Sequence, residues 1–277
     1  MKTDFFRKCQ HWYTRFQLNN TPQMNLVWGF FLYTVFGIGL LSIPWFHKTD
    51  VSLLDSIFVS TSAVSTTGLL TISLYDSYNF FGQLIVMILF QLGGIGYMTL
   101  TTYFLLFTTK KLTRWHNQII KAEFTLPDTI KIGDFIRSVI VFTIIMEVLG
   151  AVAFFIAFRR SGMEGIETIW FAVFHSVSAF CTAGFGLFND SFEGYSDNGL
   201  INTIISVLAI SGSLGFIVIT DLWYRLTGKS KKLSFTTKIV VYGFILLLTT
   251  GTVIIYFTEP LVQSDGEAVL MKSFFRP

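Results

Sequence analysis

The sequence predicts an all-α integral membrane protein, built from repeated units in which a helix, a re-entrant loop and a second helix follow one another. Three observations favour this fold class: a low content of charge, long runs without any charged residue, and a polar run that occurs twice in the same register. Of the 277 residues, 52% are hydrophobic and only 13% are charged, whereas soluble domains carry about 25% charged residues. Too few polar residues remain to cover a water-facing surface, so this composition excludes a soluble enzyme, a nucleic-acid binder and a disordered chain.

The first 24 residues combine basic and aromatic side chains without a long apolar run. Arg7, Lys8 and Arg15 accompany Trp12, a mixture typical of a segment that lies at the membrane surface. No apolar core of a cleavable signal peptide occurs within these residues. We expect residues 1–24 to form a cytoplasmic or interfacial segment, and a disordered tail is an equally acceptable interpretation.

Seven segments are long enough and uncharged enough to cross a membrane, which takes about 20 apolar residues. Six of them contain no Asp, Glu, Lys or Arg, and the seventh, 138–158, contains only Glu147. Five are rich in Leu, Ile, Val and Phe and are predicted to span the membrane: 25–46, 80–109, 138–158, 199–220 and 239–257.

The runs 56–75 and 168–189 differ from the other five. Ser and Thr occupy nine of the twenty positions of the first run, and a glycine interrupts each run, at Gly68 and at Gly184. Hydroxyl groups and glycine suit a lipid-facing helix poorly, but they suit a segment that enters the membrane from one side and returns. We therefore predict about five transmembrane helices and two re-entrant pore loops.

The distribution of basic residues favours this arrangement over seven spans. With two re-entrant loops, fifteen Lys and Arg residues lie on the side of the N-terminus and five on the other side, whereas seven spans divide them eleven to nine. Lys and Arg accumulate in the short cytoplasmic loops of membrane proteins. The N-terminus is therefore predicted to be cytoplasmic, in a plasma membrane that the chain crosses several times.

Eleven carboxylates fall on the predicted outer face, against five basic residues. Such an excess of negative charge raises the local concentration of cations. Outer loops also need carboxylates for solubility alone, and both interpretations stay open for any single carboxylate.

The two polar runs are copies of one pattern. Phe, Ser, Ser-Ala, Thr and Gly recur with the same spacing from Phe58 to Gly68 and from Phe174 to Gly184, at a constant offset of 116 residues. Residues 267–275 resemble the start of a third copy. Repeated units of transporters commonly place an ion site at their shared interface. The predicted organisation is an N-terminal segment 1–24, a first repeat 25–109, a basic cytoplasmic linker 110–134, a second repeat 135–224, a second basic linker 225–238 and the start of an incomplete third repeat 239–277.

A cation that crosses lipid loses its water and needs replacement oxygens. Backbone carbonyls supply them where a short extended segment follows a pore helix, glycine permits the required backbone conformation, and the helix directs the negative end of its dipole toward the cation. A single Thr-x-Gly has little specificity, so the recurrence in register carries the prediction. The candidate ion-binding residues are Thr66, Thr67, Gly68, Cys181, Thr182, Ala183 and Gly184.

Several other residues admit two interpretations. Glu147, the one carboxylate inside a predicted span, is either a relay or cation-attracting group or a buried structural partner of a neighbouring Ser, Thr or Lys. His175, in the second pore helix, is interpreted as a packed histidine in preference to a pH sensor. Five glycines of the second helices are predicted to serve close helix packing: Gly93, Gly94, Gly96, Gly212 and Gly215.

No bound cofactor and no metal centre are expected. The two cysteines cannot form a disulfide framework, and the four histidines are scattered without a metal-binding motif.

Three segments together resemble a known family: SAVSTTGL at 62–69, GQLIVMILFQLGGIGYM at 82–98 and FHSVSAFCTAGFGLFNDSF at 174–192. They resemble the Trk/Ktr/HKT superfamily of potassium transporters, and within it the bacterial KtrB membrane subunits. The resemblance implies four helix–pore–helix repeats around one central pore, with one filter glycine in each repeat, here Gly68 and Gly184.

The same resemblance implies a function and partners. It implies potassium uptake, with K⁺ bound by backbone carbonyls of the candidate residues, and glycine at position 68 favours K⁺ over Na⁺. It also implies a homodimer in the lipid membrane and a cytosolic nucleotide-binding regulatory (RCK-type) ring. The basic loops 110–137 and 225–238 are where such a ring could dock.

The chain departs from this family in two respects. It carries two complete repeats and the opening of a third, and Cys181 stands where asparagine or another polar residue is expected. We therefore expect a pore-forming subunit whose pore is completed by a second copy or another polypeptide, or an incomplete product that does not conduct. The alternative function is a non-conducting membrane protein that assembles or regulates through its glycine-rich helices. A membrane enzyme is disfavoured, because the sequence offers no nucleophile–base pair or metal cluster.

Overall fold

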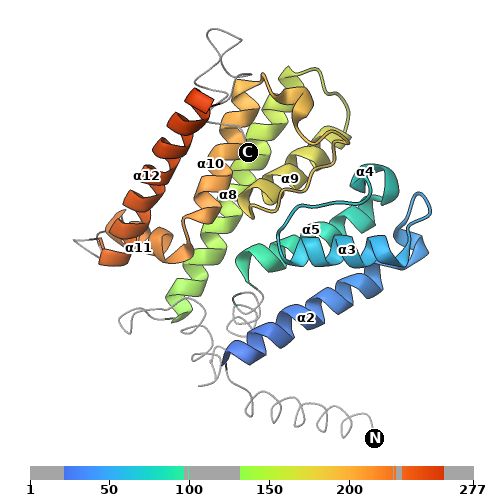
Figure 1. Ribbon diagram of the computed structural model, residues 1–277, viewed down its shortest axis with the longest axis horizontal. Helices are drawn as coiled ribbons and strands as arrows, with labels where there is room; N and C mark the ends of the chain where they lie inside the picture. Colours follow the sequence, from blue (N-terminus) through green and yellow to red (C-terminus); the bar gives the residue numbers. More distant parts are fainter. Residues whose placement is uncertain (1–21, 97–98, 100–131, 227, 229–232, 259–277) are drawn as a thin grey trace, which may run out of the picture.

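The computed structural model describes residues 22–96, 99, 132–226, 228 and 233–258. Within these residues the regular structure is helical (Figure 1), and one isolated bridge, between His47 and Tyr78, pairs two extended segments. The predicted all-α class is therefore confirmed for this part of the chain.

The first unit consists of three helices that lie side by side (Figure 1). They are α2 (Pro22–Leu41), α3 (Leu53–Val64) and α5 (Phe80–Ile95), and the connections between them hold the short helices η1 (Pro44–Phe46) and α4 (Leu74–Ser77).

The second unit repeats this arrangement. It contains α8 (Ile132–Arg160), α9 (Glu167–Phe180) and α10 (Gly199–Ser213), with the short helix η2 (Glu193–Tyr195) before α10. Helices α11 (Phe216–Leu226) and α12 (Phe235–Thr258) follow. Helix α9 packs on α8 and α10 and also contacts α5 of the first unit, so the two units meet there.

Polar side chains explain where three of the helices begin. At the start of α3, the Ser52 hydroxyl accepts a hydrogen bond from the Asp55 N–H (3.1 Å), and the Asp55 carboxylate accepts one from the Ser52 N–H (3.3 Å). The Asn79 side chain accepts from the Gly82 N–H at the start of α5, and Asn198 plays the same role for α10. Such caps satisfy N–H groups that have no partner inside the helix.

The predicted span 199–220 is wrong as one continuous helix. The chain bends by 92° between α10 and α11, and Gly215 in the bend has a φ of +84°. A Cβ atom added to Gly215 meets nothing within 4 Å, so its predicted packing role is also wrong. Gly96 ends α5 with the same φ of +84°. Both glycines end a helix because they adopt a left-handed backbone conformation, which costs glycine little.

The first predicted span, 25–46, also ends early. Helix α2 stops at Leu41, and Ile43, which precedes Pro44, is extended with φ −78° and ψ 121°. Proline disfavours helical backbone in the residue before it. The last part of the predicted span 80–109 lies outside the described residues.

Apolar helices of membrane-spanning length occur among the described residues. Ile132–Arg160 and Phe235–Ile255 are long and apolar enough to cross a membrane, and the bent pair α10–α11 adds a third if it forms one span. Helices α2, α3 and α5 contribute shorter apolar stretches. The total of five spans stays a prediction.

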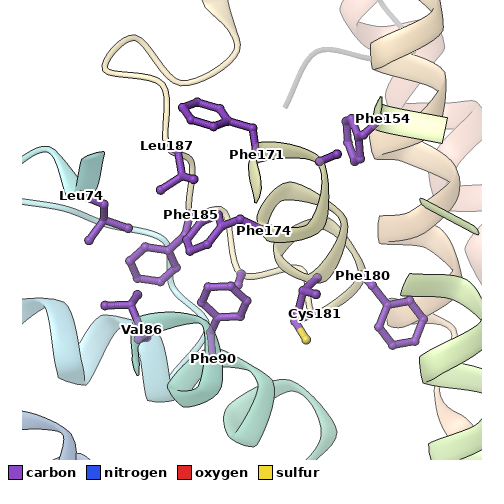
Figure 2. Close-up of a cluster of buried hydrophobic side chains, with 14 of the residues drawn as sticks. Leu74, Val86, Phe90, Phe154, Phe171, Phe174, Phe180, Cys181, Phe185 and Leu187 are labelled. Carbon is purple, nitrogen blue, oxygen red and sulfur yellow. The ribbon is translucent and has the colours of Figure 1, made fainter. Parts of the chain in front are cut away.

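A cluster of buried hydrophobic side chains lies where α5 meets α9 (Figure 2). The ring of Phe90 on α5 lies 5.5 Å from that of Phe174 on α9 and 5.6 Å from that of Phe185, which follows α9. All three side chains are buried. Close contact among aromatic rings supplies dispersion energy that does not depend on water, so it stabilises the junction of the two units within a membrane.

Three glycines allow α5 and α10 to touch the ends of α3 and α9. A Cβ atom on Gly93 of α5 would overlap the carbonyl oxygen of Val64, and one on Gly212 of α10 would overlap that of Phe180. Val64 and Phe180 are equivalent in the repeat, 116 residues apart. A Cβ on Gly94 would lie 2.8 Å from Cβ of Cys181. The predicted packing role is confirmed for these three glycines.

Candidate functional site

The candidate site consists of two short segments that follow α3 and α9 and that the sequence predicts to bind an ion. After that prediction we call them the first filter segment (65–68) and the second filter segment (181–184). Each continues from its helix with the same hydrogen bonds. The N–H of Thr67 donates to the carbonyl of Ser62, and the N–H of Ala183 donates to that of Ser178, both at 2.9 Å. Equivalent residues of the two repeats therefore have equivalent backbone contacts.

The two segments also share their backbone dihedral angles. Thr66 and Thr182 both have φ of +50°, and Gly68 and Gly184 have φ of +77° and +71°. The residues between them, Thr67 and Ala183, are not among the described residues with positive φ. A threonine with positive φ is uncommon because its branched Cβ is crowded there. Such strain, of about 1–3 kcal/mol per residue, is concentrated at functional sites.

The two filter segments meet at their glycines. A Cβ atom on Gly68 would lie 2.6 Å from the carbonyl oxygen of Ala183 and 2.9 Å from Cα of Gly184. A Cβ on Gly184 would lie 3.3 Å from Cα of Gly68. A side chain would clash at Gly68 and would be crowded at Gly184, so the structure brings together the two glycines that the repeat singled out.

Cys181 differs from the other candidate residues. Its side chain is buried, and its thiol donates to Oε1 of Gln91 on α5 at 3.1 Å. Its carbonyl accepts a hydrogen bond from the Thr182 hydroxyl at 2.7 Å, just as the Ser65 carbonyl accepts one from Thr66 at 2.8 Å. The Cys181 side chain therefore packs between the second filter segment and α5.

Gln91 links Cys181 to Glu147, the carboxylate in the middle of α8. Its Nε2 donates to Oε1 of Glu147 at 2.6 Å, while its Oε1 accepts from Cys181. The Glu147 carboxylate therefore has a structural partner, which is a glutamine of the other unit. The predicted neighbouring serine is also present, but the hydroxyl of Ser176 donates to the backbone carbonyl of Glu147 (2.7 Å) and not to its carboxylate. Sequence reasoning missed Gln91, although it is a polar residue inside the uncharged run 77–109.

Replacing Gln91 with leucine should lower the stability of the protein by about 1–3 kcal/mol, because both Glu147 and Cys181 would lose their hydrogen-bond partner in a poorly hydrated place. Thermal unfolding of the full chain in detergent would measure the loss. Glu147→Gln keeps an acceptor oxygen for Gln91 and should cost less. Equal stability of Gln91→Leu and the wild type would contradict the network.

His175 is packed inside the second unit, as the sequence analysis favoured. It is 1% exposed, its Nδ1 lies 2.7 Å from the carbonyl of Phe171, and its Nε2 lies 3.1 Å from the backbone nitrogen of Leu187. A carbonyl only accepts and a backbone N–H only donates, so Nδ1 carries the proton and Nε2 accepts.

Asp55 at the start of α3 holds the chain after the first filter segment. Its carboxylate accepts hydrogen bonds from the hydroxyl of Ser52 (2.5 Å) and from that of Thr71 (2.7 Å), and these bonds lower the pKa of Asp55. The ionised carboxylate therefore stabilises the fold above the pKa it has in an unfolded chain, and the contribution disappears as the pH falls through its lowered value.

Near the site, polar side chains at the surface join the two units. The hydroxyl of Ser73 donates to Oδ1 of Asn189 at 2.5 Å, and Nδ2 of Asn189 donates to Asp76 at 2.8 Å. The Tyr75 hydroxyl donates to Glu167 at 3.1 Å, which raises the pKa of Tyr75. Some of the carboxylates predicted on the outer face are therefore engaged in contacts between the units.

Comparison with known proteins identifies the family. The TrkH family, described as cation transport proteins, matches residues 8–271. The chain is 32% identical over 263 residues to the Potassium/sodium uptake protein NtpJ of Enterococcus hirae, covering 92% of this chain and 57% of that protein.

Two further relatives are named Ktr system potassium uptake protein B. The one from Vibrio alginolyticus is 32% identical over 221 residues, covering 79% of this chain and 48% of that protein. The one from Bacillus subtilis is 28% identical over 240 residues, covering 86% and 53%. This chain thus spans about half the length of these relatives.

The family match and the relatives confirm the resemblance seen in the sequence, and transport of cations across a membrane is a property of the family and not an enzymatic reaction. With its apolar helices, the protein is a membrane protein. The chain belongs to the TrkH family of cation transport proteins.

Proposed function

We propose that this chain forms part of the pore of a potassium uptake system, and that carbonyl oxygens of its two filter segments replace the hydration shell of K⁺. The observation that carries the proposal is the common backbone conformation of the two segments. They have matching positive φ angles and meet at Gly68 and Gly184. The residues proposed to bind K⁺ are Thr66, Thr67, Gly68, Cys181, Thr182, Ala183 and Gly184.

The chemistry of the segments supports this role. Alternation between left-handed and right-handed residues lets successive carbonyl oxygens of a short segment face the same side, as carbonyl-lined filters require. Each segment directly follows the C-terminal end of a helix, α3 or α9. The negative end of each helix dipole therefore lies next to the proposed cation site and favours positive charge there.

Potassium is the proposed cation because the relatives are named for it. The two Ktr relatives carry potassium in their names, and NtpJ carries potassium and sodium. Glycine at position 68 is a further argument, because the resemblance to the Trk/Ktr/HKT superfamily implies that a filter glycine there favours K⁺ over Na⁺.

The arrangement in the membrane follows from the same proposal. The loops 56–75 and 168–189 enter from outside and return, the N-terminus is cytoplasmic, and the membrane is the plasma membrane. Two filter segments form only part of a ring around an ion, so further repeats or another polypeptide complete the pore. A homodimer and a cytosolic RCK-type ring are proposed partners, with the ring on the basic loops 110–137 and 225–238; residues 110–131 lie outside the described part of the chain.

Growth of a K⁺-uptake-deficient strain at limiting K⁺ tests the proposal. Produced together with the repeats or the polypeptide that complete the pore, the wild-type chain should restore growth, and Gly68→Asp should abolish it because a carboxylate side chain would fill the meeting point of the filter segments. Gly39→Ala serves as the control, since a Cβ atom there meets nothing within 4 Å. Growth with Gly68→Asp equal to that of the wild type would refute the filter assignment.

Measurements of K⁺ flux through purified protein in liposomes distinguish the proposed function from the alternative, a non-conducting membrane protein. A protein that reaches the membrane and assembles but carries no K⁺ would be the non-conducting assembly or regulatory subunit. Selective K⁺ flux would eliminate that alternative.

A further inference from the structure

The two filter segments have the same backbone conformation, but the residues that follow them are held by different hydrogen bonds. Resting on the proposed function, we propose that His175 and Ser178 of α9 are positioning residues that fix the second filter segment and so set the preference for K⁺ over Na⁺. We call these two side chains the α9 clamp. The first unit has no equivalent of this clamp.

The α9 clamp holds the chain just after Gly184 at two points. The hydroxyl of Ser178 donates to the carbonyl of Phe185 at 2.6 Å, and Nε2 of His175 accepts from the N–H of Leu187 at 3.1 Å. Each of these four residues is at most 3% exposed. Hydrogen bonds in such a poorly hydrated place are strong, and each would be costly to leave unmade.

Aromatic rings prevent His175 from turning away. Its ring lies 4.9 Å from that of Phe188 and 4.8 Å from that of Phe192, both on the chain after the filter, and 5.8 Å from that of Phe158 on α8. Its Nδ1 is fixed by the carbonyl of Phe171. The histidine therefore presents a fixed acceptor to Leu187, and the chain after the second filter segment packs against the same ring.

At the equivalent positions of the first unit, neither of these two hydrogen bonds is formed. The positions 116 residues before His175 and Ser178 are Val59, which has no polar side-chain atom, and Ser62. Ser62 is 6% exposed, and its buried hydroxyl makes no hydrogen bond in the structure. The equivalent of Leu187 is Thr71, whose hydroxyl makes an exposed hydrogen bond to the carboxylate of the half-buried Asp55 at 2.7 Å.

The consequence is a difference in rigidity between the two filter segments. The second segment is fixed by buried bonds, whereas the chain after the first is held by an exposed bond to the Asp55 carboxylate. Discrimination between K⁺ and Na⁺ through carbonyl oxygens depends on how firmly the oxygens are held or how many of them there are. Loss of the α9 clamp should therefore change ion preference, and changes at the equivalent sites of the first unit should not.

The matched pair Ser178→Ala and Ser62→Ala tests this inference, because the two serines have the same place in the repeat and differ in whether the hydroxyl has a partner. K⁺ uptake by cells that express the full chain is measured with increasing Na⁺ as competitor. Ser178→Ala should reduce the preference for K⁺ over Na⁺ roughly tenfold, while Ser62→Ala should change it less than about twofold. The amount of each variant in the membrane is measured alongside.

A second pair of variants, at His175, tests the same inference if Ser178→Ala does not accumulate in the membrane. His175→Gln can place an acceptor near the position of Nε2, and His175→Asn can place its polar atoms only near Nδ1. His175→Gln should keep most of the preference for K⁺, and His175→Asn should lose it. A general loss of packing would affect both variants equally.

The outcomes separate the α9 clamp from the proposed function. Absence of K⁺ uptake by the wild-type chain in its completed pore, or full activity of Gly68→Asp there, overturns the proposed function. Selective uptake by the wild type, with equal ion preference in Ser178→Ala and Ser62→Ala or in the two His175 variants, overturns the α9 clamp alone.

Discussion

Gly212→Ala should prevent the second unit from folding correctly, with a loss of stability of about 3 kcal/mol or more. The added Cβ would overlap the carbonyl oxygen of Phe180, which is main chain and cannot move aside by a change of rotamer. Helix α10 would have to separate from α9, and the end of α9 carries the second filter segment. The yield of monodisperse full chain after extraction from membranes, together with its thermal unfolding temperature, measures the effect.

Gly93→Ala should have a similar effect in the first unit, because its Cβ would overlap the carbonyl oxygen of Val64. Gly243→Ala is the matched control, since Gly243 lies inside α12 and an added Cβ meets nothing within 4 Å. Alanine there should be tolerated and even favour the helix. Wild-type stability of Gly212→Ala and Gly93→Ala would show that the helices do not pack as described.

Gly68→Ala should reduce K⁺ uptake at least about tenfold, since a residue other than glycine at positive φ costs about 1–2 kcal/mol and each 1.4 kcal/mol corresponds to a factor of ten. The crowding adds to this cost, because the new Cβ would lie 2.6 Å from the carbonyl oxygen of Ala183. Gly184→Ala should cause a smaller loss, because its nearest neighbour, Cα of Gly68, would lie at 3.3 Å. Initial rates of K⁺ uptake at equal membrane expression would rank the variants.

Gly162→Ala is the control for the cost of placing alanine at positive φ, which Gly68→Ala and Gly184→Ala also incur. Gly162 has φ of +90° and open space around its Cβ position, in the loop between α8 and α9. Its replacement should reduce stability but leave the ratio of K⁺ to Na⁺ uptake unchanged. If Gly162→Ala altered ion preference as much as Gly68→Ala does, the effect would come from general destabilisation and not from the filter segments.

The repeat in the sequence was sufficient to predict the helices that end at Val64 and Phe180 and the two glycines that meet beyond them. It succeeded because a fixed offset of 116 residues aligns helix, helix end and glycine at once. The close packing of Gly93 and Gly212 was also predictable, since small residues inside apolar helices commonly mark close helix contacts.

Other features could not be predicted from local pattern. The bend at Gly215 lies inside an uninterrupted uncharged run, and hydropathy does not distinguish a glycine with positive φ from one in a helix. The contacts of Gln91 join residues 56 and 90 positions apart, which no periodicity reveals. The bond from Leu187 to His175 uses a backbone N–H, so the sequence gives no sign of it.

The contact between Gly212 and Phe180 joins one main chain directly to another. Side chains absorb small displacements between helices by changing rotamer, but none stands between these two residues. We therefore expect a shift of α10 to displace Phe180, the residue directly before Cys181. A movement that starts at the bend beyond α10 would then reach the second filter segment through main-chain contact alone.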